Sequence, residues 1–129
     1  MDPLIEAARE VRRNAYAPYS NYLVGAAIED VDGRVFAGVN VENISYGATI
    51  CAERAAVVKM VSEGGRKAKR LALVTSDGGN PCGICLQVLS EFTDDPTTLT
   101  ILIADETKTL RTHRLSELLP FAFDSSRVE

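Results

Sequence analysis

Hydrophobic and polar residues follow two different periods along the chain, and these periods predict its helices and strands. In the first helical stretch, from residue 3 to about residue 15, the apolar positions three or four apart are Leu4, Ile5, Ala8 and Val11. This spacing places them on one face of a helix. A second helix is predicted from Ile50 to Glu63, with Thr49 as its N-cap, and a third from Cys82 to Phe92.

Shorter apolar runs predict the strands. The first two extend from Tyr22 to Ile28 and from Arg34 to Val41, and the Asp32-Gly33 pair between them is typical of a hairpin turn. The small residues of the first strand, from Gly25 to Ala27, fit close packing against a helix or room for a ligand, and packing is the favoured interpretation. The remaining strands are predicted at Leu71–Thr75, Leu99–Ala104 and Thr109–Arg114.

Helices and strands alternate after the opening hairpin, which indicates the α/β class. We therefore expect a three-layer α-β-α sandwich, in which helices cover both faces of a mixed central sheet of about five strands. The chain has 129 residues, the size of one domain with one core. We expect residues 1–129 to form that single domain.

Composition narrows the possible partners and the location. The formal charge is −4, and no long cluster of lysine and arginine stands out, which argues against binding to nucleic acid or to an anionic membrane. The N-terminal residues are too polar for a secretory signal, and no apolar run reaches membrane-spanning length. We therefore expect a cytoplasmic protein, whose cysteines are reduced and serve as metal ligands or catalytic groups.

The three cysteines of the chain lie in two short motifs, Cys51-Ala52-Glu53-Arg54 and Pro81-Cys82-Gly83-Ile84-Cys85. Three thiolates are one ligand short of a tetrahedral zinc site and leave the fourth position to water, as in catalytic zinc sites. The one histidine, His113, lies in a different and polar context. The sequence therefore predicts one catalytic Zn²⁺, with Glu53 acting on the bound water.

Both motifs fall at the starts of predicted helices. Backbone N–H groups and the positive ends of two helix dipoles would then lie beside the sulfurs, which lowers the pKa of a thiol and offsets the charge of three thiolates. Arg54 is placed to compensate the same charge through hydrogen bonds to sulfur. A second polar pair, Asn40 and Glu42, ends a predicted strand and suits a hydroxylated ligand such as a sugar.

Two other readings of the cysteines stay open at this level. Cys82 and Cys85 alone fit a thiol-disulfide oxidoreductase, although this reading leaves Cys51 and Glu53 without a role. A small binding module stabilised by a closed zinc site is the other reading, and it predicts no catalysis.

Taken together, these motifs resemble those of the small zinc-dependent cytidine deaminases. The matching segments cover nearly the whole chain, and they are residues 19–27, Asn40-Val41-Glu42-Asn43, the two cysteine motifs, and residues 118–123. The resemblance implies the cytidine deaminase-like fold. It also implies hydrolytic deamination of cytidine and 2′-deoxycytidine, a reaction of pyrimidine salvage, by zinc-bound hydroxide with Glu53 as proton shuttle.

The same resemblance assigns roles to further residues. Asn40 and Glu42 would hold the ribose 3′-hydroxyl, and the backbone of Ala52 would read the edge of the base. Tyr22 stands where the family usually has phenylalanine, as an aromatic wall for the base. The family's small members are homotetramers in which a C-terminal aromatic residue, here Phe123, reaches the pocket of a neighbouring subunit.

One position departs from the family pattern. After Cys85 the family usually has arginine and then glutamine, whereas this chain has Leu86 and Gln87. Arg54 would then carry more of the charge compensation. Within the family, a deaminase of another cytosine nucleoside, such as an antibiotic of the blasticidin type, is the alternative to the ordinary nucleoside. Editing of polynucleotides is less favoured because the chain is acidic.

Overall fold

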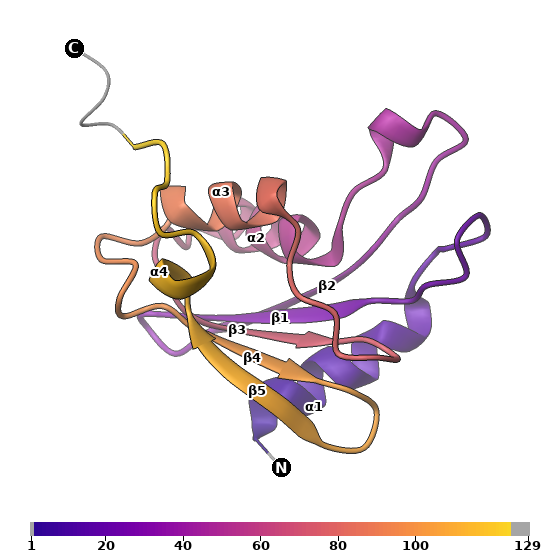
Figure 1. Ribbon diagram of the computed structural model, residues 1–129, viewed down its shortest axis with the longest axis horizontal. Helices are drawn as coiled ribbons and strands as arrows, with labels where there is room; N and C mark the ends of the chain where they lie inside the picture. The colour runs from indigo at the N-terminus through magenta and orange to yellow at the C-terminus, as the bar shows by residue number, and fades with distance from the viewer. Residues whose placement is uncertain (1, 125–129) are drawn as a thin grey trace.

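The computed structural model describes residues 2–124, which form a five-stranded sheet in the order β2-β1-β3-β4-β5. The strands are β1 (Gly25–Asp30), β2 (Val35–Val39), β3 (Ala68–Val74), β4 (Thr100–Ala104) and β5 (Thr109–Arg114). Strands β3 and β4 are parallel, while all other neighbours are antiparallel. The sheet is therefore mixed, as the sequence predicted (Figure 1).

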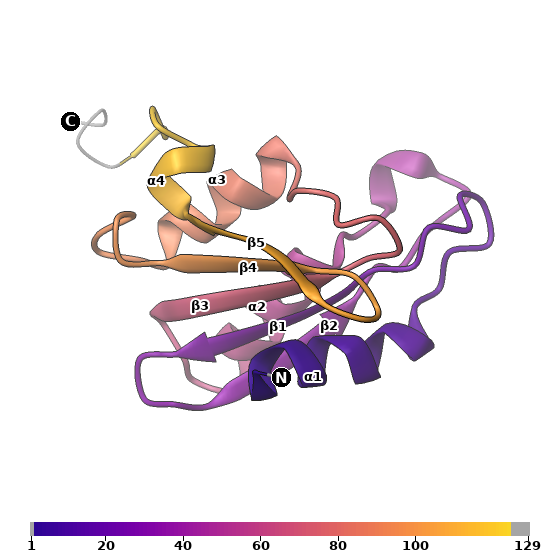
Figure 2. The same cartoon turned by 60° about the horizontal axis from the view of Figure 1, so that its bottom comes forward.

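Helices cover both faces of this sheet. Helix α1 (Pro3–Val11), continued by a 3₁₀ turn at Arg12–Asn14, lies on one face, and α2 (Ala52–Ser62), α3 (Gly83–Glu91) and α4 (Leu115–Leu118) lie on the other (Figures 1 and 2). The predicted three-layer arrangement is confirmed. No helix within residues 2–124 combines the length and apolar character that crossing a bilayer requires.

Successive side chains of each strand point to opposite faces of the sheet, and this divides the hydrophobic core into two layers. In β3, Leu71 and Leu73 face α2 and α3, while Ala72 and Val74 face α1. Strand β1 divides in the same way, because successive side chains of a strand point to opposite faces. A sheet buried on both sides thus provides a rigid platform for the segments at its edge.

The first strand begins three residues later than predicted, at Gly25 instead of Tyr22. The amide side chain of Asn40 explains the difference. Its Nδ2 donates a hydrogen bond to the carbonyl of Tyr22 (2.8 Å), and its Oδ1 accepts one from the N–H of Val24 (3.0 Å). A side chain therefore takes the place of a neighbouring strand beside residues 22–24.

The predicted N-cap of the second helix is wrong. Cys51, not Thr49, occupies the N-cap position of α2, and Thr49 is extended. The hydroxyl of Thr49 accepts a hydrogen bond from the N–H of Asn43 (3.1 Å) and so closes residues 40–51 into a projecting segment, here called the arm. An antiparallel bridge between Val41 and Ile50 joins the two sides of the arm.

Glycine lets two helices approach the sheet closely. A Cβ atom on Gly25 would lie 2.1 Å from the carbonyl oxygen of Ala8 in α1, and one on Gly38 would lie 2.5 Å from the backbone nitrogen of Ala56 in α2. Both contacts are with backbone, which cannot turn away as a side chain can. The small residues of β1 thus serve packing against a helix, as expected.

A substitution at Gly38 tests this packing. We expect Gly38→Ala to lower the free energy of unfolding by about 1–3 kcal/mol, because the added methyl group overpacks the contact with α2. Gly47→Ala is the matched control, since nothing lies within 4 Å of a Cβ atom there. Denaturant unfolding of both variants measures the difference, and equal stabilities would contradict the packing argument.

Candidate zinc centre and active site

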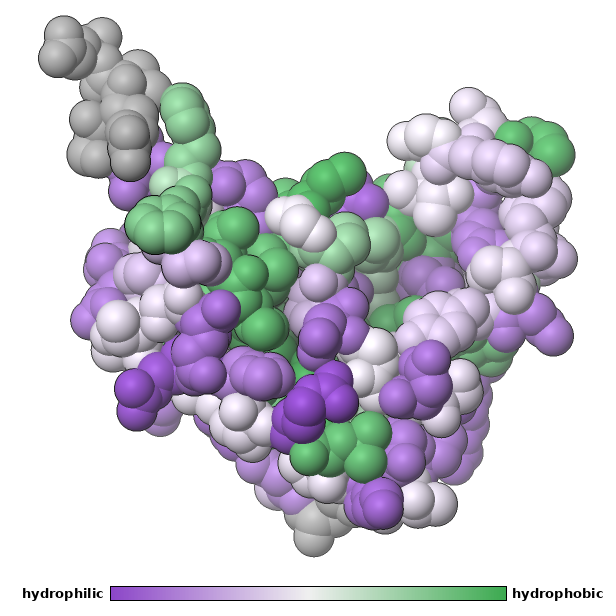
Figure 3. Space-filling model, in the orientation of Figure 1, coloured by the Kyte–Doolittle hydropathy of each residue, from purple (hydrophilic) through white to green (hydrophobic). Residues whose placement is uncertain are grey.

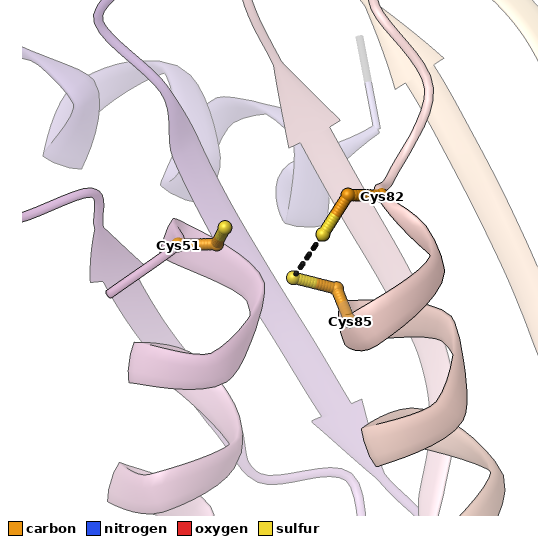
Figure 4. A group of neighbouring side chains, drawn as sticks. All are labelled: Cys51, Cys82 and Cys85. Carbon is orange, nitrogen blue, oxygen red and sulfur yellow. Dashed lines mark hydrogen bonds between the residues drawn. The ribbon is translucent and has the colours of Figure 1, made fainter. Parts of the chain in front are cut away.

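The three cysteine sulfurs converge from the starts of two helices. Cys51 and Cys82 occupy the N-cap positions of α2 and α3, and Cys85 lies in the first turn of α3. All three sulfurs lie within 4.8 Å of one another, and those of Cys82 and Cys85 are 3.4 Å apart (Figure 4). Sulfurs about 2.3 Å from a tetrahedral zinc would be roughly 3.8 Å apart, so the three fit this ion.

Neither N-cap cysteine makes a side-chain capping hydrogen bond. The sulfurs therefore remain available, while the unpaired N–H groups of two first turns lie at the same place. The positive ends of both helix dipoles favour negative sulfur. Within residues 2–124, no histidine or carboxylate joins this group of possible ligands. His113 lies on β5, where its Nδ1 is 3.8 Å from a carboxylate oxygen of Glu117.

The pKa values of two of the thiols, Cys51 and Cys85, are shifted in opposite directions. The pKa of Cys51 is lowered to about 5, chiefly because its sulfur accepts a hydrogen bond from Cys85, with help from Arg54. The pKa of Cys85 is raised because its thiol donates to Cys51 and because it is buried beside Glu53. One thiolate beside a held proton is the expected state of such a cluster before a cation replaces the proton.

Arg54 lies against this cluster. Its Nη2 is 3.5 Å from the sulfur of Cys51 and 3.4 Å from the carbonyl oxygen of Thr49. The Cys51 thiolate raises the pKa of Arg54, with a further contribution from Cys85. The Nε of Arg54 is buried without a partner among the described residues, which places an uncompensated donor next to the site.

Leu86 is part of the hydrophobic core, with 7% of its surface exposed. It packs in the same cluster as Leu89 of α3 and Ala56 of α2. The position that carries arginine in the family pattern therefore supplies apolar packing in this chain. Arg54 is left as the cation that contacts the sulfurs.

Glu53 lies in the first turn of α2 with 5% of its surface exposed. Burial raises the pKa of Glu53 to about 6, and the negative charge of Cys51 adds to the effect. A carboxyl group with this pKa can both hold and release a proton near neutral pH. Its position two residues after a ligand candidate puts this proton beside the sulfurs.

Glu53 and the sulfur cluster open into a cavity of about 300 Å³. Of the predicted site residues, Cys85, Arg54 and Phe123 do not line this cavity. The lining residues are Ser20, Tyr22, Val24, Asn40, Glu42, Thr49, Cys51, Ala52, Glu53, Leu73, Thr75, Gly79, Asn80 and Cys82. The space-filling view shows the molecule notched between the arm and the helical body (Figure 3). A larger hollow of about 450 Å³ lies beside Phe123 and includes none of the cysteines.

Two predicted ribose ligands also shape the wall of the cavity. Asn40 holds the backbone of residues 22–24, as described above. The carboxylate of Glu42 accepts hydrogen bonds from the N–H groups of Tyr19 (3.0 Å) and Ser20 (3.1 Å) and from the hydroxyl of Ser20. These bonds lower the pKa of Glu42, chiefly through the Ser20 hydroxyl. The side chains of Asn40 and Glu42 therefore use some of their hydrogen-bond donors and acceptors to hold the backbone of the cavity wall.

The hydroxyl of Tyr22, which the usual phenylalanine lacks, has a partner in the structure. It donates a 2.7 Å hydrogen bond to Oδ1 of Asp77, in the loop between β3 and α3. Sequence reasoning missed Asp77, because one carboxylate in a polar loop has no periodic signal. The one signal in the sequence that Asp77 belongs to the site is that its loop directly precedes Cys82.

Phe123 does not line the cavity of its own chain. Its side chain is 65% exposed, and the amide of Gln87 in α3 holds its backbone. Gln87 Nε2 donates to the carbonyl of Phe123 (2.7 Å), and the N–H of Phe123 donates to Gln87 Oε1 (3.2 Å). Gln87 is the second residue that sequence reasoning missed, since nothing in the pattern links positions 36 apart.

The sequence was compared with protein families and with curated proteins. Residues 2–100 match the family model described as the cytidine and deoxycytidylate deaminase zinc-binding region. A cytidine deaminase of Sporosarcina psychrophila is 42% identical over 127 residues, which cover 95% of this chain and 90% of that protein. That of Mycobacterium tuberculosis strain H37Rv is 45% identical over 118 residues, or 90% of this chain and 84% of that one.

Solved structures give the same result. The crystal structure of cytidine deaminase from Burkholderia pseudomallei has a TM-score of 0.87 and 43% identity, and the match covers 95% of this chain and all (100%) of that one. The Mycobacterium tuberculosis structure has a TM-score of 0.81 and 44% identity, with 94% of each chain covered. The chain therefore belongs to the cytidine and deoxycytidylate deaminase zinc-binding family.

Proposed function

We propose that this protein hydrolyses cytidine and 2′-deoxycytidine to uridine and 2′-deoxyuridine and releases ammonia. The observation that carries the proposal is the cavity of about 300 Å³ that Cys51, Cys82 and the buried Glu53 line, with the sulfur of Cys85 in the same cluster. Family membership points to the same chemistry. The products are reusable pyrimidine nucleosides, so the reaction serves pyrimidine salvage.

In this mechanism, Cys51, Cys82 and Cys85 would hold one Zn²⁺, which when bound would lower the pKa of a water molecule and so supply the nucleophile. Glu53 would take a proton from the attacking water on its carboxylate and deliver it to N3 of the pyrimidine while the oxygen adds to C4. Glu53 then carries the second water proton to the amino group, which leaves as ammonia. Its pKa of about 6 suits both transfers.

The rest of the cavity would bind the nucleoside. Asn40 and Glu42 would bind the ribose 3′-hydroxyl, Tyr22 would form a wall for the base, and the backbone of Ala52 would bind its edge. All four residues line the cavity. None of the lining residues is a lysine or arginine, whereas two are glutamates. A neutral nucleoside therefore fits this cavity better than a phosphorylated one.

The thiol-disulfide alternative accounts for Cys82 and Cys85 only. Cys51 and Arg54 lie in the same cluster, and neither has a role in a dithiol reaction. The alternative of an antibiotic substrate shares the chemistry of cytosine deamination and differs only in the sugar part. Asn40 and Glu42, placed in the cavity, favour the ordinary nucleoside.

We further propose that the protein assembles as a homo-oligomer, with a tetramer as the expected state. Large apolar side chains that a monomer would leave in water support this, namely Tyr16, Ile44, Tyr46, Phe121 and Phe123. The Gln87 clamp presents Phe123 outward, as a contribution to a neighbour's pocket requires. We also propose that residues 1–129 act as a single domain. The expected location is the cytoplasm, where the cysteines stay reduced.

The central test is an ultraviolet assay with cytidine. We expect the wild type to convert cytidine to uridine with loss of absorbance. The Glu53→Ala variant should have a kcat lower by about 100-fold or more, because the proton shuttle is removed. Zinc content near one per chain in both proteins is the control. A wild type without deamination, or a fully active variant, would refute the proposal.

A second variant tests charge compensation. We expect Arg54→Gln to lower zinc content or kcat by about 10- to 100-fold, because a charge-assisted contact to the Cys51 sulfur is lost. Arg54→Lys keeps the charge and should lose less. Metal analysis and kinetics of both variants give the result. Normal metal content and rate in Arg54→Gln would count against this role.

Oligomers that contain two different variants test whether one subunit contributes Phe123 to the cavity of its neighbour. Phe123→Ala should raise KM by about tenfold, or about 1.4 kcal/mol, while Glu53→Ala is inactive. If Phe123 completes a neighbour's cavity, co-refolding the two variants restores sites with low KM. Co-refolding Phe123→Ala with a chain that carries both substitutions is the control. Monomeric elution, or mixed oligomers without low-KM sites, would exclude shared pockets.

A further inference from the structure

A hydrogen bond joins two segments that flank the cavity. Tyr22, whose ring lines the cavity, lies just before β1, and Asp77 lies in the loop after β3 that leads to Cys82. The Tyr22 hydroxyl donates to Oδ1 of Asp77 over 2.7 Å. The pKa of Asp77 is held below its usual value, chiefly by this bond, and burial raises the pKa of Tyr22. Donor and acceptor therefore keep their states at neutral pH.

Asp77 is itself fixed to the end of the sheet. Its Oδ1 accepts hydrogen bonds from the N–H of Gly79 (3.2 Å) and from the hydroxyl of Thr75 (3.3 Å). Thr75 is buried, and its hydroxyl oxygen accepts from the N–H groups of Gly78 (2.8 Å) and Gly79 (3.0 Å). The acceptor for Tyr22 thus belongs to a tightly bonded turn.

The turn packs against the hydroxyl of Tyr22 and is also held by a residue of β5. A Cβ atom on Gly79 would lie 2.5 Å from Tyr22 Oη. From β5, Arg111 Nη2 donates to the carbonyl of Gly78 (2.6 Å) and to Oδ1 of Asn80 (2.8 Å). The loop that carries Asp77 therefore has little freedom to follow a moving ring.

We propose that Asp77 is a positioning residue, which fixes the Tyr22 ring at the cavity wall and ties that wall to the segment leading to Cys82. A ring held in its binding orientation loses no freedom when a flat base stacks on it, so the bond lowers KM. The phenylalanine usual at this position in the family cannot make the bond. The inference rests on the proposed deamination of cytidine.

The test is a double-mutant cycle in the cytidine assay. Tyr22→Phe and Asp77→Ala should each raise KM about three- to tenfold, the effect of one hydrogen bond, with kcat and zinc content within about twofold of wild type. The double variant should be no worse than either single variant. Asp77→Asn keeps a carbonyl acceptor and should restore KM. Asp32→Ala, in the hairpin turn, is the control.

The outcomes separate this inference from the proposed function. Additive effects, an unchanged KM in Asp77→Ala, or a joint fall of kcat and zinc content with constant KM would overturn the positioning role alone. A wild type that does not deaminate cytidine would overturn the proposed function and this role with it.

Discussion

The close approach of three sulfurs, which would all be thiolates around a metal ion, is the constraint on which the rest of the structure depends. They lie within 4.8 Å of one another, and thiolates this close repel unless positive charge surrounds them. The fold supplies part of that charge through two helix starts. Strand β1 is antiparallel to both β2 and β3, so β2 and β3 end at the same edge of the sheet. The helices that follow these two strands therefore begin side by side.

One part of the cavity wall, residues 20–24, lies outside the regular elements and is held by polar side chains. Residues 19–24 belong to no strand and lie between α1 and β1. Asn40 and Glu42 bind their backbone from one side, and Arg12 donates from Nε to the carbonyl of Leu23 (2.8 Å) from the other. A segment outside the regular elements that is fixed in this way can present its side chains to a ligand from a defined position.

The reactive residues of the site could be predicted from the sequence more readily than the backbone segments and hydrogen bonds that hold them in place. Residue type and spacing alone marked the cysteines and Glu53, and the structure brings them together. The strand start at Tyr22 was predicted wrongly because a distant side chain, Asn40, satisfies its backbone. Thr49 has the residue type of a helix cap, yet it closes the arm. Asp77 and Gln87 act through single long-range hydrogen bonds, which leave no pattern in the sequence.

The charges at the site explain how Leu86 is tolerated there. Two charges of a zinc ion and one of Arg54 balance three thiolates, so no further cation is needed at the sulfurs. Leu86 instead joins the core that holds α3 against α2. Burial is the main influence on the pKa of Glu53, which is raised to about 6, and the negative charge of Cys51 adds to the effect. The leucine thus contributes apolar packing between the two helices, while Arg54 provides the positive charge at the sulfurs.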